Sequence, residues 1–136
     1  MNRPGSLPDQ VAHWLAGDDA LLFLARTEAT GLAALLAEHD ITALSVDLSA
    51  ISDKAGLMAE MHSALGLGDW FGANWDALND ALYGLDESSG RPQVLLLDMP
   101  AGERKLPEAD TQTLLDIIGD VAASDGSPLR GAIVLH

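Results

Sequence analysis

Several residue types are absent or scarce in this chain of 136 residues, and each absence excludes a class of protein. There is no cysteine, so a disulfide framework, a thiolate nucleophile and a cysteine-based zinc site are excluded. No run of about 18 apolar residues occurs, so we expect no membrane span. The first residues contain no apolar run of the kind found in a secretory signal. We therefore expect a cytoplasmic protein.

Positive charge is also scarce. Seven Lys and Arg residues stand against 21 Asp and Glu residues, which gives a net charge of -14. Phosphate groups and anionic lipids would repel such a chain, so we expect it to bind neither nucleic acid nor membranes directly. The imbalance is concentrated in residues 55–90 and 106–129, which contain acids but neither Lys nor Arg. This pattern fits a solubilising surface, and it equally fits a field that attracts a basic partner.

The remaining composition, 48% hydrophobic and 21% charged, is that of a globular domain. Short apolar runs alternate with amphipathic helical patterns, which indicates parallel strands joined by right-handed crossovers. We therefore predict one α/β domain with a mainly parallel sheet of three to four strands and crossover helices packed on it. The predicted strands are 21–25, 41–48, 94–97 and 132–135, and the predicted helices are 8–15, 30–38, 53–65, 75–83 and one that begins at residue 110 or 111. Thr30 is the expected N-cap of the second helix.

The stretch 70–85 is the most distinctive because it contains four of the six aromatic residues and two acids one helical turn apart. Gly72 allows a tight turn, and Asn74 can cap the following helix by accepting hydrogen bonds from backbone NH groups. Gly84 is placed to end that helix. A helix turns about 100° per residue, so one arc is apolar and the other polar. The apolar arc contains Trp75, Leu78, Ala81, Leu82 and Leu85, and the polar arc contains Asp76, Asn79, Asp80 and Tyr83.

The two aspartates of the polar arc differ in what explains them. Asp76 lies in the first turn, where the helix dipole favours an acid, so a purely structural role suffices for it. Asp80 follows four residues later and adds roughly 0.2 to 0.5 kcal/mol of repulsion. No Lys or Arg lies within a turn to relieve it, whereas the cations of a partner would. Trp70 suits either a core position or a rigid contact anchor beside the glycine turn.

Three other chemistries fit less well. Residues 66–72 lack the G-x-G-x-x-G spacing and contain no Lys, so we expect no phosphate-binding loop. The four histidines form no H-E-x-x-H motif and no i, i+4 pair, so we expect neither a metal nor a cofactor. Asp76 and Asp80 could act as the carboxylate pair of a small glycoside hydrolase, which would need a substrate cleft.

The same stretch resembles the barstar family of ribonuclease inhibitors, whose hallmark is a block that runs from two aromatic residues and Gly, through Asn and Asp-Ala-Leu, to a second Asp. Here the block reads Trp70-Phe71-Gly72-Ala73-Asn74-Trp75-Asp76-Ala77-Leu78-Asn79-Asp80. The expected order of strands and helices over residues 41–136 also agrees with that family. The resemblance implies a barstar-like domain at 41–136. Residues 1–40 would then form an N-terminal extension, with a short helix, an extra strand and a helix, packed on the same domain.

The resemblance also implies a function. A protein of this family is not an enzyme; it is an immunity protein that blocks the active site of a small basic ribonuclease, or of a related toxin nuclease, and so protects the cell that makes it. Asp80 matches the aspartate that enters the phosphate-binding centre of the nuclease, and Asp76 matches a second acid that faces a basic residue. Asp120 falls where the family places an acid on the later helix. The expected partner-binding residues are Asp80, Asp76, Trp70, Gly72, Asn74, Asn79, Tyr83 and Asp120.

Three positions depart from the barstar pattern. Asn79 and Leu85 stand where barstar has tryptophans, and Ala73 stands where barstar has an acid. The aromatic part of the contact surface is therefore expected to be thinner here. The alternative function is that of an acidic adaptor, which keeps the fold and binds a basic partner other than a nuclease.

Overall fold

The computed structural model describes residues 6–68, 72–85, 91–99 and 106–136. Its sheet has four strands in the order β1-β4-β3-β2, and every pair of neighbours is parallel. The strands are β1 (Leu21–Leu24), β2 (Thr42–Asp47), β3 (Gln93–Asp98) and β4 (Leu129–Leu135). The predicted α/β class with a mainly parallel sheet is thus confirmed.

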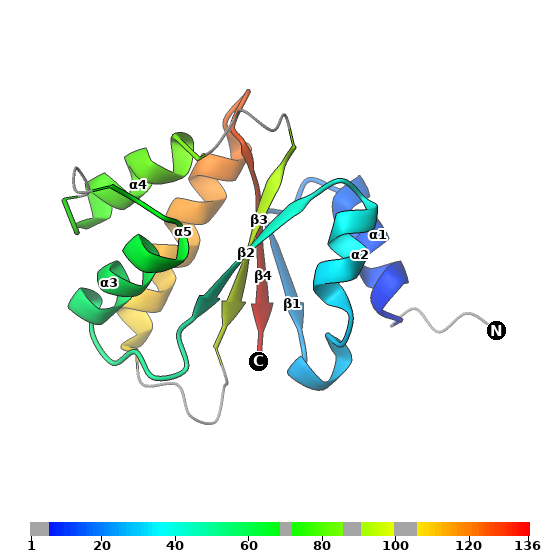
Figure 1. Cartoon of the computed structure of the whole chain (residues 1–136), viewed down its shortest axis with the longest axis horizontal. Coiled ribbons are helices and arrows are strands. Elements are labelled where there is room, and N and C mark those ends of the chain that lie inside the picture. Colours follow the sequence, from blue (N-terminus) through cyan, green and yellow to red (C-terminus); the bar gives the residue numbers. More distant parts are fainter. Residues whose placement is uncertain (1–5, 69–71, 86–90, 100–105) are drawn as a thin grey trace.

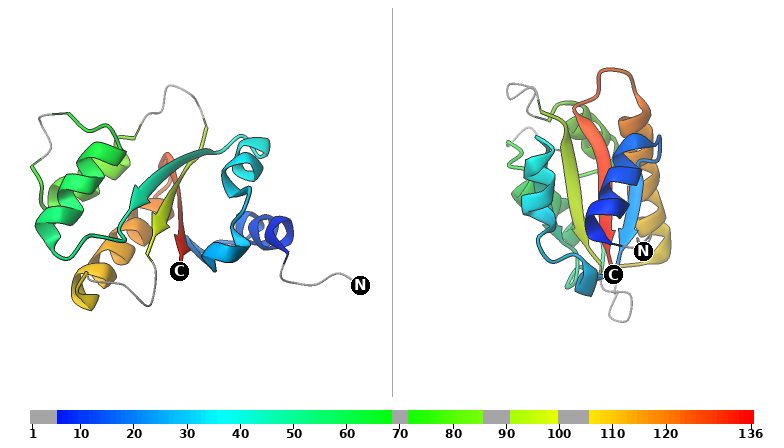
Figure 2. Two further views of the ribbon diagram at one scale, coloured as in Figure 1. Left: turned by 60° about the horizontal axis from the view of Figure 1, so that its bottom comes forward. Right: turned by 90° about the vertical axis from the view of Figure 1, so that its right-hand side faces the viewer.

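Helices cover both faces of the sheet (Figure 1). One face carries α3 (Lys54–Ala64), α4 (Trp75–Tyr83) and α5 (Glu108–Ala123), and the other carries α1 (Leu7–Ala16) and α2 (Leu32–Glu38). A short 3-10 helix, η1 (Arg26–Glu28), follows β1. Figure 2 shows the same layers from two further directions. Among the described helices, none is both long and apolar enough to cross a membrane.

The central strand β3 explains why the sheet is buried on both faces. Leu95 and Leu97 belong to the apolar cluster under α3, α4 and α5, whereas Val94 and Leu96 belong to the cluster under α1 and α2. Successive side chains of a strand point to opposite faces, so an unbroken apolar run supplies both clusters. The run at 94–97 therefore specified a central strand.

Local signals placed some helix boundaries and missed others. Asn74 caps α4 as predicted, with its Oδ1 accepting from the backbone NH of Ala77 at 2.8 Å. The prediction for α2 was wrong, because its N-cap is Gly31 and not Thr30. The chain enters α2 with a φ of 82° at that residue, a conformation that glycine adopts without strain. Gly84 does follow α4, but with a φ of -97°, so it is not a left-handed cap.

Strand β4 begins three residues earlier than predicted because it contains a bulge. Gln93 pairs with Leu129 and Val94 pairs with Gly131, which leaves Arg130 as the extra residue. Gly131 has a φ of 152°, and a Cβ atom at this position would overlap the carbonyl oxygen of Ala20. The close approach of the chain at Ala20 therefore requires glycine.

The bulge directs Arg130 toward the segment that precedes β1. Its guanidinium donates to the carbonyl oxygens of Trp14 at 2.6 Å, Asp19 at 2.7 Å and Gly17 at 3.1 Å. The same group lies 4.5 Å from the centroid of the Trp14 ring. Trp14 and Gly17 lie at the end of α1, where carbonyls have few intrahelical donors, so Arg130 adds hydrogen bonds there beyond the one that Trp14 accepts from the backbone NH of Gly17. This clamp joins residues 14–19 to β4.

Candidate partner-binding face

The outer face of α4 is the surface on which most of the predicted site residues lie. Most of the predicted apolar arc is buried, since Leu78, Ala81, Leu82 and Leu85 are at most 5% exposed, whereas Trp75 at the start of the helix is half-buried. The opposite arc faces solvent: Asp76, Asp80 and Tyr83 are exposed and Asn79 is half-buried. Asn74 and Gly72 are exposed at the start of the helix. The amphipathic interpretation of this helix is confirmed.

The carboxylates of Asp76 and Asp80 have no cation beside them in the part of the chain that the structure describes. The salt bridge found there joins Arg26 and Asp98, with Nε and Oδ1 3.2 Å apart. The i, i+4 repulsion between the two aspartates is consequently unrelieved within the described protein. Both side chains are exposed, so a cationic partner can approach them.

Tyr83 links the end of α4 to the end of α5. Its hydroxyl lies 2.7 Å from Ser124 Oγ, and the Ser124 hydroxyl donates to the carbonyl oxygen of Asp120 at 3.1 Å. Because serine has one hydroxyl proton, Tyr83 must be the donor to Ser124. The backbone of Asp120 therefore lies close to Tyr83, and the side chain of Asp120 is exposed.

The turn before α4 is held by hydrogen bonds from Asn74. In addition to its cap, Asn74 donates from Nδ2 to the carbonyl oxygen of Gly72 at 3.3 Å. The left-handed residue of this turn is Ala73, with a φ of 54°, which the sequence reasoning did not anticipate. A non-glycine residue in this conformation carries strain. Trp70, the remaining predicted contact, lies outside the described residues.

The departures from the barstar pattern now have positions in space. Leu85 is 5% exposed and belongs to the core, so it adds nothing to an outer surface. Asn79 lies half-buried between the apolar arc and the acidic arc. No group of three or more His, Asp or Glu side chains within the described ranges could hold a metal ion. What the face offers is therefore negative charge and hydrogen-bond acceptors.

The sequence from residue 41 to 133 matches the family described as Barstar (barnase inhibitor). The chain belongs to the barstar family. The matched region contains β2, β3 and most of β4 together with α3, α4 and α5, whereas α1, β1 and α2 precede it. The family is one of inhibitors and not of enzymes. No curated protein matches the chain.

Solved structures with a similar fold belong to larger proteins. The Walker-type ATPase PABY2304 of Pyrococcus abyssi has a TM-score of 0.62 and 18% identity, over 99% of this chain and 45% of that one. The ORC2 protein of Aeropyrum pernix, solved as ADPNP-ADP complexes, has a TM-score of 0.59 and 11% identity, over 93% and 37%. Cdc6p of Pyrobaculum aerophilum has a TM-score of 0.59 and 18% identity, over 96% and 37%. The chain spans less than half of each, and the likeness shows a shared fold alone.

Proposed function

We propose that this barstar-family protein binds and blocks the active site of a small basic ribonuclease or a related toxin nuclease. The carboxylates of Asp80 and Asp76 would occupy the positions that RNA phosphates take in the enzyme. The observation that carries the proposal is the exposed acidic arc of α4, which has no cation beside it among the described residues. A nuclease that binds phosphate through Arg, Lys and His offers the cations that this arc lacks.

The way α4 is held supports tight binding. Leu78 and Leu82 are fully buried, and Tyr83 joins the helix to α5 through Ser124. A helix that is already rigid loses little conformational freedom when a partner binds, so less of the interaction energy is spent on ordering. Close charge pairs in the related barnase–barstar complex itself couple by about 1.5 to 7 kcal/mol, and we expect a coupling in that range for Asp80.

Charge beyond the contact supports fast binding. The net charge of -14 creates a field that attracts a basic protein over a distance of about one Debye length. Asp120 on α5 would extend the acidic surface beyond α4. Association should therefore slow steeply as salt is added.

The test is a titration of the protein with barnase, followed by both calorimetry and inhibition of RNA cleavage. We expect salt-sensitive binding that Asp80→Ala weakens by about a hundredfold or more. Glu38→Ala is the matched control, because it removes one exposed carboxylate from α2 on the opposite face of the sheet. If Asp80→Ala and Glu38→Ala leave affinity equally unchanged for every nuclease that binds, phosphate mimicry by Asp80 is refuted.

One observation favours the acidic adaptor as a second candidate. Leu85 is buried and Asn79 half-buried where barstar has tryptophans, so the aromatic anchors of a nuclease inhibitor are reduced. An adaptor would bind its basic partner through the same acidic arc without inhibiting RNA cleavage. Binding of a nuclease with no loss of its activity would favour the adaptor over the inhibitor.

A further inference from the structure

The outer edge of β1 has no neighbouring strand among the described residues, because β1 is the last strand of the sheet on the β4 side. On its inner edge, the carbonyl oxygens of Ala20 and Leu24 accept from the backbone NH groups of Ala132 and His136, at 2.9 and 3.0 Å. In a parallel pair, alternate residues direct their peptide groups to the neighbour. The NH and CO groups of the intervening Leu21 and Phe23 therefore point outward, away from β4.

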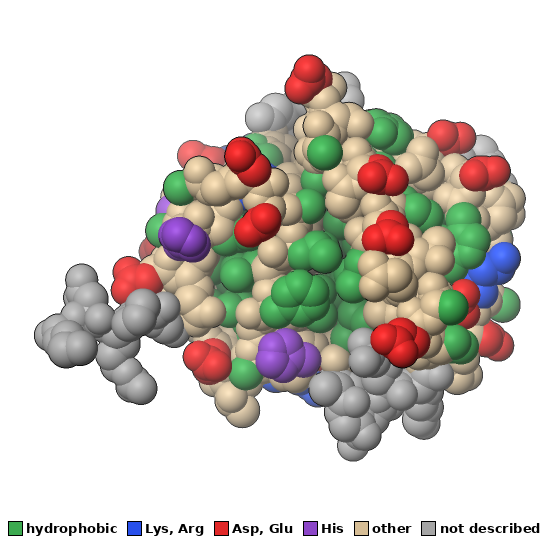
Figure 3. All heavy atoms as spheres, turned by 180° about the vertical axis from the view of Figure 1, so that it is seen from behind, with side chains coloured by type: hydrophobic (Ala, Val, Ile, Leu, Met, Phe, Trp, Pro, Cys, Tyr) green, Lys and Arg blue, Asp and Glu red, His purple; other side chains and the backbone are tan. Residues whose placement is uncertain are grey.

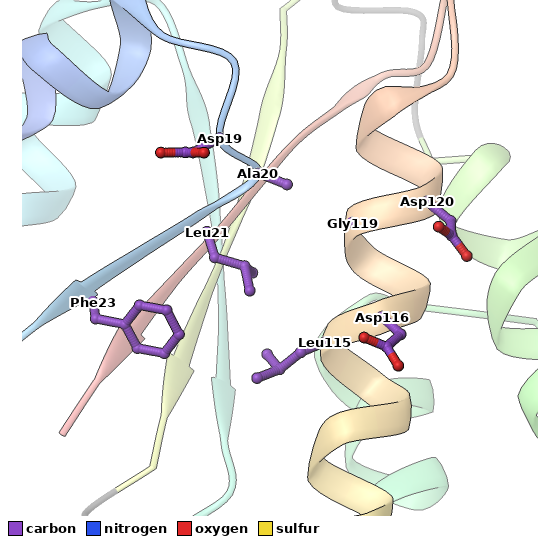
Figure 4. A pocket seen from close by; sticks show the side chains of 8 residues that line it. All are labelled: Asp19, Ala20, Leu21, Phe23, Leu115, Asp116, Gly119 and Asp120. Carbon is purple, nitrogen blue, oxygen red and sulfur yellow. The ribbon is translucent and has the colours of Figure 1, made fainter.

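A groove runs between this edge and α5, with a volume of about 830 Å³. Leu21, Phe23 and Leu115 point into the space between β1 and α5 (Figure 4). Phe23 is 53% exposed, an unusual position for a large apolar side chain. At Gly119 an added Cβ would meet no atom within 4 Å, so α5 stands back from the strand at that point. We call this the β1–α5 groove, and its lining residues are Asp19, Ala20, Leu21, Phe23, Leu115, Asp116, Gly119 and Asp120.

The hollow continues around the edge of β1 onto the side of α1. A second part is lined by Gly17, Asp18, Ala123 and Arg130 among others, and a third by His13, Trp14 and Leu22 among others. The edge of β1 is thus accessible from both faces of the sheet. Figure 3 shows this side of the molecule as a strip of apolar side chains with acidic side chains on both sides of it.

Acidic side chains surround the groove on both sides. Asp18 and Asp19 precede β1, while Asp116 and Asp120 lie on α5. Among the described residues that line these hollows, Arg130 is the one Lys or Arg. Its guanidinium already donates to three backbone carbonyls. Four carboxylates against one occupied guanidinium leave the groove negative.

Apart from its short length, the strand lacks the usual protection of a free edge. Natural edge strands carry a charge, a proline or a bulge that prevents pairing with other chains. β1 consists of Leu21, Leu22, Phe23 and Leu24, and it contains none of these features. Its short length limits the outward peptide groups to those of two residues, so backbone hydrogen bonds alone would bind weakly. Charge must supply the rest of the affinity and the choice of partner.

We propose that an extended basic segment of a partner protein binds in the β1–α5 groove and adds to the sheet as a strand beside β1. Addition of a strand to a free sheet edge is an established mode of peptide recognition. Basic side chains on the segment would meet the surrounding aspartates, and an apolar side chain would cover Phe23. A second copy of this chain is a poor occupant, because its own net charge of -14 would repel the same aspartates.

The test uses an acetylated synthetic peptide that alternates lysine and valine, added to the full chain and followed by NMR. We expect the amides of Leu21 and Phe23 to become protected from solvent exchange on binding, while those of Leu22 and Leu24 are protected before it. A glutamate–valine peptide of the same length tests the role of charge. Two lysine–valine peptides N-methylated on opposite alternate residues test the strand, since only one of them retains the NH groups that face β1.

Variants of the protein test the same surface without disturbing the core. Phe23→Pro removes an outward NH and leaves the hydrogen bonds to β4 intact, as proline is tolerated on sheet edges. Phe23→Thr removes the aromatic ring but keeps the NH. We expect each to weaken the lysine–valine peptide, with the proline variant at least about tenfold weaker than wild type. Asp18→Asn with Asp19→Asn should also weaken it, whereas Glu28→Gln with Glu38→Gln, an equal change of charge elsewhere, should not.

Four outcomes overturn the proposal. They are no binding of the lysine–valine peptide, equal binding of the glutamate–valine peptide, binding without protection of the Leu21 and Phe23 amides, and self-association in sedimentation that Phe23→Pro abolishes. The last would identify a second copy as the occupant of the edge. Because none of these measurements involves Asp76 or Asp80, their failure is distinguishable from failure of the proposed inhibition.

Discussion

Replacement of Arg130 should detach the N-terminal segment from the sheet. The guanidinium makes three hydrogen bonds to carbonyl oxygens of residues 14, 17 and 19 and lies over the Trp14 ring. Hydrogen bonds from a charged donor contribute about 1.5 to 3 kcal/mol each when buried. Arg130 is half-buried, so we take about 1 kcal/mol for each bond and about 0.5 to 1 kcal/mol for the ring contact. Arg130→Ala should therefore lower the free energy of unfolding by about 4 kcal/mol.

Arg130→Lys tests the geometry of the guanidinium apart from its charge, because lysine keeps the positive charge but lacks the planar arrangement of donors. A lysine ammonium at this position could reach one of the three carbonyls, so we expect a loss of about 2 to 3 kcal/mol. Burial lowers the pKa of Arg130, and Asp18 and Asp19 oppose that shift, but an arginine stays charged at neutral pH. The geometry of the donors, and not the presence of the charge, should decide the outcome.

Urea denaturation of the three proteins measures these losses. Hydrogen exchange at the Ala132 amide, which donates to Ala20, reports whether β1 opens separately from the rest. Lys54→Ala is the control, since it also removes one positive charge, from an exposed site at the start of α3. The clamp is refuted if Arg130→Ala costs less than about 1 kcal/mol and Ala132 exchanges as in wild type.

Three further changes test other features of the chain. Gly131→Ala should destabilise by about 3 kcal/mol or more, seen as a lower melting temperature, because its Cβ would overlap Ala20; a neutral effect would contradict the bulge. Ala73→Gly should stabilise by roughly 0.5 to 1 kcal/mol in urea, since it removes left-handed strain before α4; a loss would contradict that backbone. Hydrogen bonds from the Ser49 hydroxyl and backbone NH lower the pKa of Asp47. The Asp47 carboxylate therefore stabilises the fold at pH values above its unfolded pKa, and this stabilisation is lost as the pH falls through its folded pKa. Ser49→Ala should thus be less stable at pH 7, with a difference that shrinks below about pH 4; urea curves at several pH values would contradict this if the difference were constant.

Local patterns predicted the parts of the fold that depend on local energetics. The apolar and polar arcs of α4 could be predicted from the helical period, because a side chain's direction on a helix depends only on its position along that helix. The cap at Asn74 followed for the same reason. The order of the strands did not follow, since β1 pairs with β4 across more than 100 residues. Periodicity indicates that a strand exists but not which strand lies beside it.

Features that arise where distant segments meet were missed. The sequence analysis did not single out Arg130, whose guanidinium bonds to carbonyls more than 110 residues away in the sequence. The strand was predicted from Ala132 because Arg and Gly interrupt the apolar run, and a bulge accommodates both. The one available signal was Gly131 directly before the strand, since an isolated glycine there indicates a close backbone approach.

Helix α5 connects the two proposed surfaces, which lets them be separated by experiment. Its buried residues Leu114, Ile118 and Val121 hold it on the core, and its exposed sides carry Asp120 near Tyr83 and line the β1–α5 groove. The acidic arc of α4 lies within the part of the chain that matches the barstar family, while β1 lies in the preceding segment. Changes at Asp80 should thus leave peptide binding at β1 intact, and changes at Phe23 should leave nuclease binding intact. Loss of both activities in either variant would mean that the segment before residue 41 and the family domain form one binding unit.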